Sequence, residues 1–176
     1  MQKIQMFVKD ALMSYKYKIF STIAPFVFFL DQLTKFLILK YVTLGDAIPI
    51  IDGFFDIVHV RNTGAAFGMF AHLTNSVRVP FFYAISLLAV VILITVFKEL
   101  KPTDRFSPYP LSLISAGVLG NLVDRLRFGN VVDFLSFHVR DKAIWGFQLE
   151  WPAFNIADSA ITISMILLGI HLLRGK

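Results

Sequence analysis

The sequence predicts an all-α membrane protein with four transmembrane helices, a small extracytoplasmic β-cradle and an interfacial loop. Apolar residues make up 56% of the 176 residues and charged residues only 16%. A soluble domain of this length could not bury so much apolar surface. Four apolar stretches approach the roughly 20 residues that a helix needs to cross a bilayer. The length fits one domain, so we expect residues 1–176 to form a single integral membrane domain.

The four predicted spans differ in polarity. They cover about residues 19–41, 80–97, 109–127 and 156–173. The third span is the least apolar, because it contains serines, glycines, an asparagine, an aspartate and an arginine. Small residues let neighbouring helices approach closely. We therefore expect the third span to lie in the middle of the bundle.

Basic residues are concentrated on one side of the predicted membrane. The N-terminal flank, the loop after the second span and the C-terminal end carry Lys3, Lys9, Lys16, Lys18, Lys98, Lys101, Arg105, Arg174 and Lys176. The two longer loops, 42–79 and 128–155, carry only Arg61, Arg78, Arg140 and Lys142. Because Lys and Arg accumulate in cytoplasmic loops, both termini are expected in the cytoplasm and the long loops on the outer face.

The two outer loops have different patterns. Residues 47–60 alternate apolar and polar positions, with Pro49 and Gly53 as turn residues, which predicts short strands on the membrane surface. Residues 135–153 mix Trp and Phe with Arg, Lys and Glu, a composition that suits the water–lipid interface. An interfacial loop is expected there.

Composition excludes several kinds of chemistry. The chain has no cysteine, which rules out disulfides, thiolate catalysis and cysteine-ligated metals. Its four histidines are scattered without ligand spacing, so no metal or cofactor is predicted. The net charge of +5 is spread around the apolar stretches and forms no single patch, so nucleic acid is not an expected partner.

Polar and ionisable groups gather in the outward half of the predicted bundle. They are Asp31, Gln32, Thr34, Lys35, Asn62, Thr63, Asn121, Asp124, Arg125, Asp133, Asn155 and Asp158. Such groups are costly at membrane depth unless they pair or line a wet cavity, so a functional site is the first interpretation. A structural network that pins the helices together is the alternative.

Some of these groups have simpler explanations. Asp31 and Lys35 lie four residues apart with the acid first, which favours a structural ion pair over a contact with a lipid head group. Arg125 could either brace a carboxylate or hydrogen-bond a substrate carbonyl, and both remain open. The polar turn at residues 62–67 is either a tight helix approach or a backbone platform for an extended peptide.

Asp133 and Asp158 have the placement of an acid–base pair. Asp133 follows the third span and Asp158 begins the fourth, so neighbouring helices would bring both carboxyls to the same face. Two carboxyls in contact cannot both ionise easily, so one keeps a proton while the other acts as a general base toward water. A helix N-terminus near Asp158 favours its charged form and makes it the expected base.

Five sequence blocks resemble the signal peptidase II (lipoprotein signal peptidase) family of bacterial aspartyl peptidases. They occur in the family's order across most of the chain, and are Asp31-Gln-Leu-Thr-Lys35, Asn62-Thr-Gly-Ala-Ala-Phe67, Gly120-Asn-Leu-Val-Asp-Arg125, Val131-Val-Asp-Phe134 and Phe154-Asn-Ile-Ala-Asp158. Their combination is much more specific than any one of them.

The resemblance implies an intramembrane endopeptidase of the bacterial inner membrane, with its active site toward the outer face. It would cleave diacylglyceryl-modified prolipoproteins just before the lipidated cysteine. The implied catalytic pair is Asp133 and Asp158. The implied binding or supporting residues are Asn62, Gly64, Asn121, Asp124, Arg125, Asn155, Asp31 and Lys35. Inhibition by globomycin, contact with membrane lipids and a monomeric state are also expected, without any cofactor.

Three other kinds of protein are alternatives. A small ion-coupled carrier could use the buried carboxylates as a proton path, but the sequence has no internal repeat, and the acids gather at one face. A non-catalytic scaffold would tolerate alanine at both aspartates. A Ser–Lys peptidase is weaker, since no serine has a base beside it in the sequence.

Overall fold

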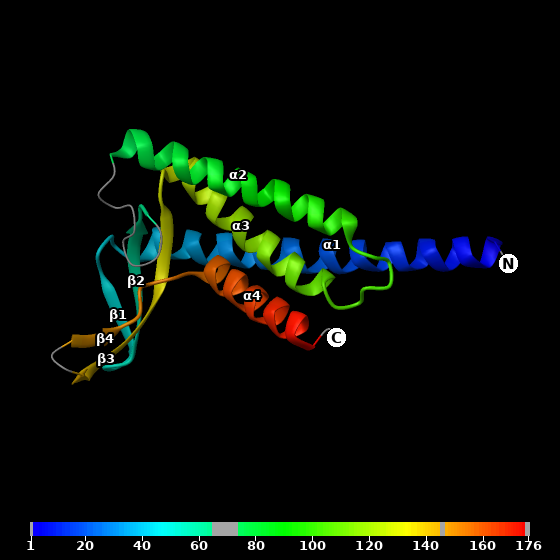
Figure 1. Cartoon of the computed structure of the whole chain (residues 1–176). Coiled ribbons are helices and arrows are strands. Elements are labelled where there is room, and N and C mark those ends of the chain that lie inside the picture. Colours follow the sequence, from blue (N-terminus) through cyan, green and yellow to red (C-terminus); the bar gives the residue numbers. More distant parts are fainter. Residues whose placement is uncertain (1, 65–73, 145–146, 175–176) are drawn as a thin grey trace.

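Four helices form a bundle, and a small sheet lies at one end of it (Figure 1). The computed structural model describes residues 2–64, 74–144 and 147–174. In chain order the elements are α1 (Gln2–Tyr41), β1 (Ala47–Ile51), β2 (Phe55–Asn62), α2 (Asn75–Glu99), α3 (Pro108–Phe128), β3 (Val131–Ile144), β4 (Phe147–Glu150) and α4 (Ile156–Arg174). The start of α1 and the end of α4 lie at the end of the bundle opposite the sheet (Figure 1).

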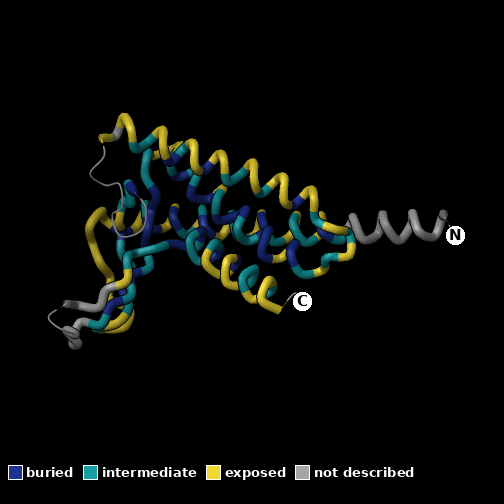
Figure 2. The backbone as a smooth tube through the Cα atoms, viewed as in Figure 1, coloured by how far each residue is buried: buried dark blue, intermediate teal, exposed yellow. Residues whose placement is uncertain are grey.

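Three of the helices are long and apolar enough to cross a membrane. Among the described residues these segments are Tyr15–Tyr41, Ser76–Glu99 and Ile156–Arg174, in α1, α2 and α4. The outward sides of α2 and α4 are exposed (Figure 2), and large apolar side chains such as Leu87 (61% exposed) lie there. An exposed surface of this kind suits contact with lipid. The chain is a multi-pass membrane protein.

Helix α3 lies inside the bundle and contacts the other three helices, as its small residues predict. A Cβ atom added to Gly117 would meet the carbonyl oxygen of Ala157, and one added to Gly120 would meet the carboxylate of Asp31. Glycine at these positions therefore lets α4 and α1 approach the backbone of α3. Buried residues follow α3 into the start of β3 (Figure 2).

The end of α3 sets the position of β3. Gly129 adopts a left-handed conformation (φ 71°), and its N–H donates to the carbonyl oxygen of Arg125 at 2.8 Å. This conformation is the usual way for a helix to end on glycine. Strand β3 begins two residues later at Val131, so Asp133 is held close to the end of α3.

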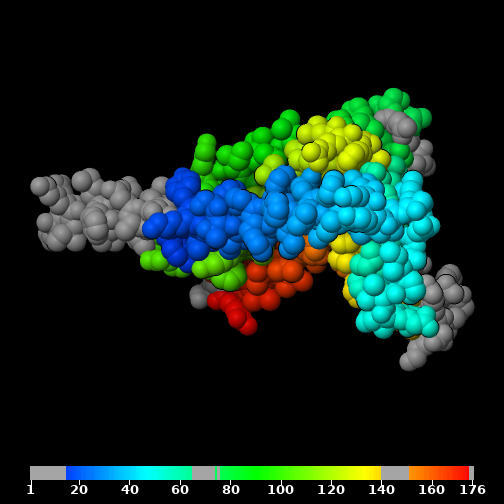
Figure 3. All heavy atoms as spheres, turned by 180° about the vertical axis from the view of Figure 1, so that it is seen from behind, coloured from blue at the N-terminus to red at the C-terminus, as the bar shows by residue number. Residues whose placement is uncertain are grey.

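The four strands form one antiparallel sheet in the order β1-β2-β3-β4. Asp133 of β3 pairs with Val60 of β2, and Val131 pairs with Asn62. All five residues of β1 are exposed at the edge of the sheet. Figure 3 shows α1 lying along one face of the bundle, with β1 and β2 projecting from its end.

A short bridge attaches the start of α4 to the sheet. The backbone N–H of Leu135 donates to the carbonyl oxygen of Phe154 at 2.8 Å, and the N–H of Phe154 donates back at 3.0 Å. Since α4 begins at Ile156, this bridge places its first turn beside β3.

The predicted elements agree with the structure except at two places. All four predicted spans lie within helices, but α1 begins at Gln2 instead of about residue 19, because residues 2–18 contain no glycine or proline to stop it. The strands predicted in 47–60 are present as β1 and β2. The interfacial loop predicted for 135–153 is wrong in form: β3 continues to Ile144 and pairs with β4. Trp145 of that loop is outside the described residues.

Candidate active site

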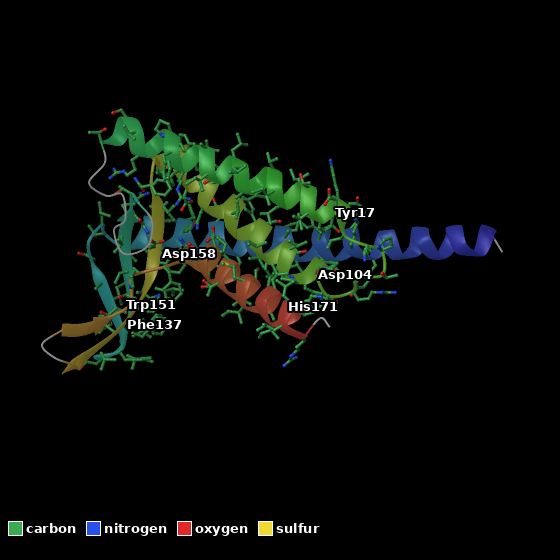
Figure 4. All side chains as sticks on the ribbon, in the orientation of Figure 1. Tyr17, Asp104, Phe137, Trp151, Asp158 and His171 are labelled. Carbon is green, nitrogen blue, oxygen red and sulfur yellow. The ribbon has the colours of Figure 1, made fainter. Side chains whose placement is uncertain are left out.

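Asn155 connects the two aspartates singled out in the sequence. Its side-chain Nδ2 donates to Oδ1 of Asp133 at 2.7 Å, and its backbone N–H donates to Oδ2 of Asp158 at 3.2 Å. Its Oδ1 accepts the backbone N–H of Asp158 at 2.9 Å. The two reciprocal bonds between Asn155 and Asp158 form a capping box at the start of α4. The capping box and the side-chain hydrogen bond to Asp133 together hold both carboxyls at one site. Figure 4 shows Asp158 at the start of α4, near the sheet.

Strand β2 supplies a second amide to Asp133. Nδ2 of Asn62 donates to Oδ2 of Asp133 at 2.9 Å. The backbone N–H of Gly64 donates to Oδ1 of Asn62 at 3.0 Å, which fixes the amide with its nitrogen toward the carboxyl. Ala65, Ala66 and Phe67 of this motif lie outside the described residues.

Helix α3 supplies an amide to Asp158. Nδ2 of Asn121 donates to Oδ1 of Asp158 at 2.8 Å. Oδ1 of Asn121 accepts Nζ of Lys35 at 3.0 Å and Nδ2 of Asn155 at 3.2 Å. Asn121 therefore links Asp158 to a buried lysine below it.

Lys35 is the centre of a buried ionic cluster. Its Nζ lies 2.9 Å from Oδ2 of Asp31 and 3.0 Å from Oδ2 of Asp124. All three side chains are 2% exposed or less. The ion pair between Asp31 and Lys35 predicted from their spacing is present, and Asp124 joins it from α3.

The two acids of the cluster also hold the backbone around the site. Oδ1 of Asp31 accepts the N–H of Ala157 in α4 at 2.9 Å. Oδ2 of Asp124 accepts the N–H of Val132 in β3 at 3.1 Å. These bonds fix the residues next to Asp158 and Asp133. Asp31 and Asp124 thus have partners within the fold, whereas Asp158 also lines a cavity.

Arg125 lies on another side of α3 from Asp124. Its guanidinium stacks over the ring of Phe82, 5.2 Å from the ring centroid, and the charges of Asp158, Asp133 and Asp124 act on it. It makes no ion pair within 4 Å among the described residues. Its Nη1 donates to the carbonyl oxygen of Asn121 at 3.4 Å.

The environment of Asp133 favours a bound proton. The side chain is 1% exposed. Burial and the neighbouring charge of Asp158 raise the pKa of Asp133 to about 7, while the bonds from Asn62 and Asn155 oppose that rise. Asp158 accepts two N–H bonds in the first turn of α4, where the helix dipole favours a negative charge. The pair is thus arranged to share one proton near neutral pH.

A cavity of about 480 Å³ opens beside Asp158. Its lining combines polar side chains, among them Asn62, Asp158 and Thr162, with apolar ones, among them Trp151, Phe154 and Ile161. Sequence reasoning missed Thr162 as a site residue. Its position one helical turn after Asp158 is the signal that could have found it.

The site residues predicted from the sequence form one connected group. Asn62, Gly64, Asn121, Asn155, Asp133 and Asp158 are joined by hydrogen bonds, and Lys35, Asp31 and Asp124 lie beneath them. Arg125 borders the group. Gln32 is a further member, because its Nε2 donates to both Asp31 and Asp124.

Comparison with known proteins identifies the family. The family model described as signal peptidase (SPase) II matches residues 23–174. The chain belongs to the signal peptidase II family. The resemblance seen in the sequence is thereby confirmed, and family membership makes the chain a peptidase. No comparison supports an ion-coupled carrier.

Individual relatives cover most of the chain. The lipoprotein signal peptidase of Syntrophotalea carbinolica is 44% identical over 150 residues, which cover 85% of this chain and 88% of the relative. The lipoprotein signal peptidase of Geobacter sulfurreducens is 40% identical over 158 residues, covering 90% and 93%.

Two solved structures, both described as bacterial membrane enzymes, have the same fold. One has a TM-score of 0.72 and 38% identity, and covers 88% of this chain and 87% of the other. The second has a TM-score of 0.74 and 35% identity, covering 89% and 94%. The fold of this signal peptidase II is therefore that of a known kind of membrane enzyme.

Proposed function

We propose that this signal peptidase II removes signal peptides from prolipoproteins with Asp133 and Asp158 as its catalytic pair. The observation that carries the proposal is the double contact of Asn155, which holds one carboxyl through its amide and the other through a helix cap. The names of the relatives, lipoprotein signal peptidases, support the substrate class. Cleavage falls just before a diacylglyceryl-modified cysteine.

The two carboxyls have different tasks in the proposed reaction. Asp158, as the carboxylate, accepts a proton from a water molecule while the water oxygen attacks the carbonyl carbon of the scissile peptide bond. Asp133, as the neutral acid, donates a hydrogen bond to the carbonyl oxygen, where negative charge develops. The C–N bond then breaks as the leaving nitrogen takes the proton held by Asp158. The products are the signal peptide carboxylate and the free amine of the cysteine.

The surrounding residues bind the substrate and support the pair. Asn62 and Asn155 orient Asp133, and Asn121 orients Asp158. Gly64 fixes the Asn62 amide. The cation of Arg125 binds a substrate carbonyl next to the scissile bond.

The same proposal extends to the placement of the chain. Helix α3 is a fourth span whose charged residues are shielded by the other helices. The termini face the cytoplasm of a bacterium and the site faces the outer side of the inner membrane. The lipid-modified substrate enters sideways from the bilayer, along the apolar residues that line the cavity. The chain acts as a monomer and is inhibited by globomycin.

The proposed activity is tested with purified protein and a diacylglyceryl-modified prolipoprotein. Mass spectrometry of the products should show a single cut just before the modified cysteine, unaffected by a chelator. An unmodified prolipoprotein serves as the control and should be cut much more slowly. Equal cutting of both substrates, or cutting abolished by the chelator, would contradict the proposal.

A further inference from the structure

A second hollow lies far from the two aspartates, at the end of the bundle where α2 ends. We call it the α1–α2 groove, and its lining includes Tyr17, Phe20, Leu93, Phe97, Lys98 and Leu119. Figure 4 shows Tyr17 beside the end of α2, well separated from Asp158. The groove has a volume of about 460 Å³, within the roughly 300–1,000 Å³ of sites that bury small ligands.

The walls of the groove are apolar and partly open. The ring of Phe97 packs against Tyr17 in an edge contact, with centroids 5.5 Å apart, and against Phe20 at 4.8 Å. Tyr17 remains 50% exposed and Leu119 38% exposed. Because these residues lie on α1, α2 and α3, the groove faces outward from the bundle between α1 and α2 and is open to an acyl chain.

Of the two lysines near this end of the groove, only Lys98 offers its charge to a ligand. Lys16 is 2% exposed, and its Nζ donates to the carbonyl oxygens of Phe97, Lys98 and Leu100 at 3.0 to 3.3 Å. Its donors are therefore used within the fold. Lys98 is exposed at the edge of the groove. Its side chain has no ion pair with a described residue, so it can bind an anion.

We propose that the α1–α2 groove is a specific site for an anionic phospholipid of the surrounding bilayer. One acyl chain lies against Phe97 and Leu119, and the phosphate binds Nζ of Lys98. A signal peptide is the other apolar molecule that could occupy the groove, but its charge does not fit. The N-terminal region of a signal peptide is positively charged and would be repelled by the exposed cation of Lys98, whereas an anionic head group is attracted by it.

The test measures lipid binding by the full-length, delipidated protein with native mass spectrometry. The probes are phosphatidylglycerol, phosphatidylethanolamine and an apolar peptide with a basic N-terminus. Leu93→Trp fills the groove, and Leu87→Trp is its control on the exposed, lipid-facing side of the same helix. Lys98→Gln removes the cation of the groove. Its control is Lys18→Gln, which removes an exposed charge next to Tyr17 in α1 from a residue that does not line the groove.

We expect one phosphatidylglycerol molecule to bind more tightly than phosphatidylethanolamine. Binding should be lost in Leu93→Trp and weakened about fivefold in Lys98→Gln, while both controls match the unmodified protein. Ile94→Trp, at a half-exposed groove position, is the second groove-filling variant if Leu93→Trp does not fold.

Four results would overturn the site. Equal phosphatidylglycerol binding by all variants, or equal loss in Leu87→Trp, would mean ordinary annular lipid. Stronger binding of the peptide than of phosphatidylglycerol would assign the groove to a signal peptide. Equal binding of both phospholipids would remove the role of Lys98. The proposed catalytic function is unaffected by any of these, because the groove contains none of its residues.

Discussion

Asn155 alone positions both Asp133 and Asp158, a role that would otherwise need two separate residues. Its side chain donates to Asp133 and accepts from the backbone of Asp158, so the orientation of one amide sets both carboxyls. The spacing of Asn155 and Asp158 is visible in the sequence as a helix-start signal. The contact across to β3 is not, since it depends on the bridge between Phe154 and Leu135.

The amide of Asn62 favours the charged form of Asp133, against burial and the neighbouring charge of Asp158. With the pKa of Asp133 raised to about 7, the neutral acid is lost as the pH rises through that value, so kcat/KM should fall above about pH 7. Asn62→Ala removes a donor that favours the charged form. The pKa of Asp133 should rise by about one unit, and the alkaline limb of the pH profile should move up with it.

A matched variant separates this effect from general damage. Asn130→Ala removes an amide that accepts a hydrogen bond from Arg61 and lies outside the cavity. The alkaline limb of the pH profile of this variant should not move. A limb that stays unchanged in Asn62→Ala would show that Asp133 does not set the alkaline pH limit.

Lys35 is the cation that neutralises the buried carboxylates of Asp31 and Asp124. Lys35→Met would leave Asp31 and Asp124 buried together without their cation. Removal of one partner from a buried ion pair costs about 3–5 kcal/mol, so the free energy of unfolding in detergent micelles should drop by this order. Lys40→Met, which alters an exposed lysine that stacks on Phe36 and Tyr41, should change it by less than about 1 kcal/mol. Similar values for the two variants would contradict the structural role of the cluster.

At the scale of the elements, the site depends on three attachments. Gly129 ends α3 and directs the chain into β3, the Phe154 bridge fixes the start of α4, and glycines in α3 admit the neighbouring helices. The positions of the four helices could be predicted from the length of the apolar stretches in the sequence. The start of β3 could have been predicted, because residues 135–140 alternate apolar and polar side chains. The charged residues 140–142 interrupt this alternation, so the rest of β3 is a strand only through its pairing with β4.

Gly120 is expected to be intolerant of any side chain. A Cβ atom there meets the carboxylate of Asp31, which is held by Lys35 and Ala157. Gly120→Ala should therefore lower the free energy of unfolding by about 1–3 kcal/mol through overpacking. Gly169→Ala, in α4, meets nothing within 4 Å and should be neutral or stabilising. Equal effects of the two substitutions on thermal unfolding would mean that α1 and α3 are not packed closely here.

At the scale of the whole molecule, the sheet lies at one end of the bundle, and the start of α1 and the end of α4 lie at the other (Figure 1). The distribution of Lys and Arg predicted such a polarity from the sequence, and the proposed orientation places the sheet outside the cytoplasm. The ion pair of Lys35 with Asp124 and the α1–α2 groove could not be predicted, because both combine residues from helices that are distant in the sequence.

The absence of native cysteine makes the orientation directly measurable. Asp52→Cys introduces a thiol at an exposed turn before β2, and Thr103→Cys introduces one in the exposed loop between α2 and α3. In intact cells with a permeabilised outer membrane, a membrane-impermeant maleimide should label only Asp52→Cys. Both should be labelled after lysis. The reverse pattern would place the site on the cytoplasmic face.

The most direct measurement is the cleavage rate of Asp133→Asn and Asp158→Asn on a diacylglyceryl-modified prolipoprotein. Each substitution keeps the size of the side chain and removes its acid–base function, so each should abolish detectable cleavage while leaving unfolding and membrane insertion close to those of the unmodified chain. Asp52→Asn, an exposed aspartate away from the site, should cleave normally. Near-normal cleavage by either variant would contradict the assignment of Asp133 and Asp158 as the catalytic pair.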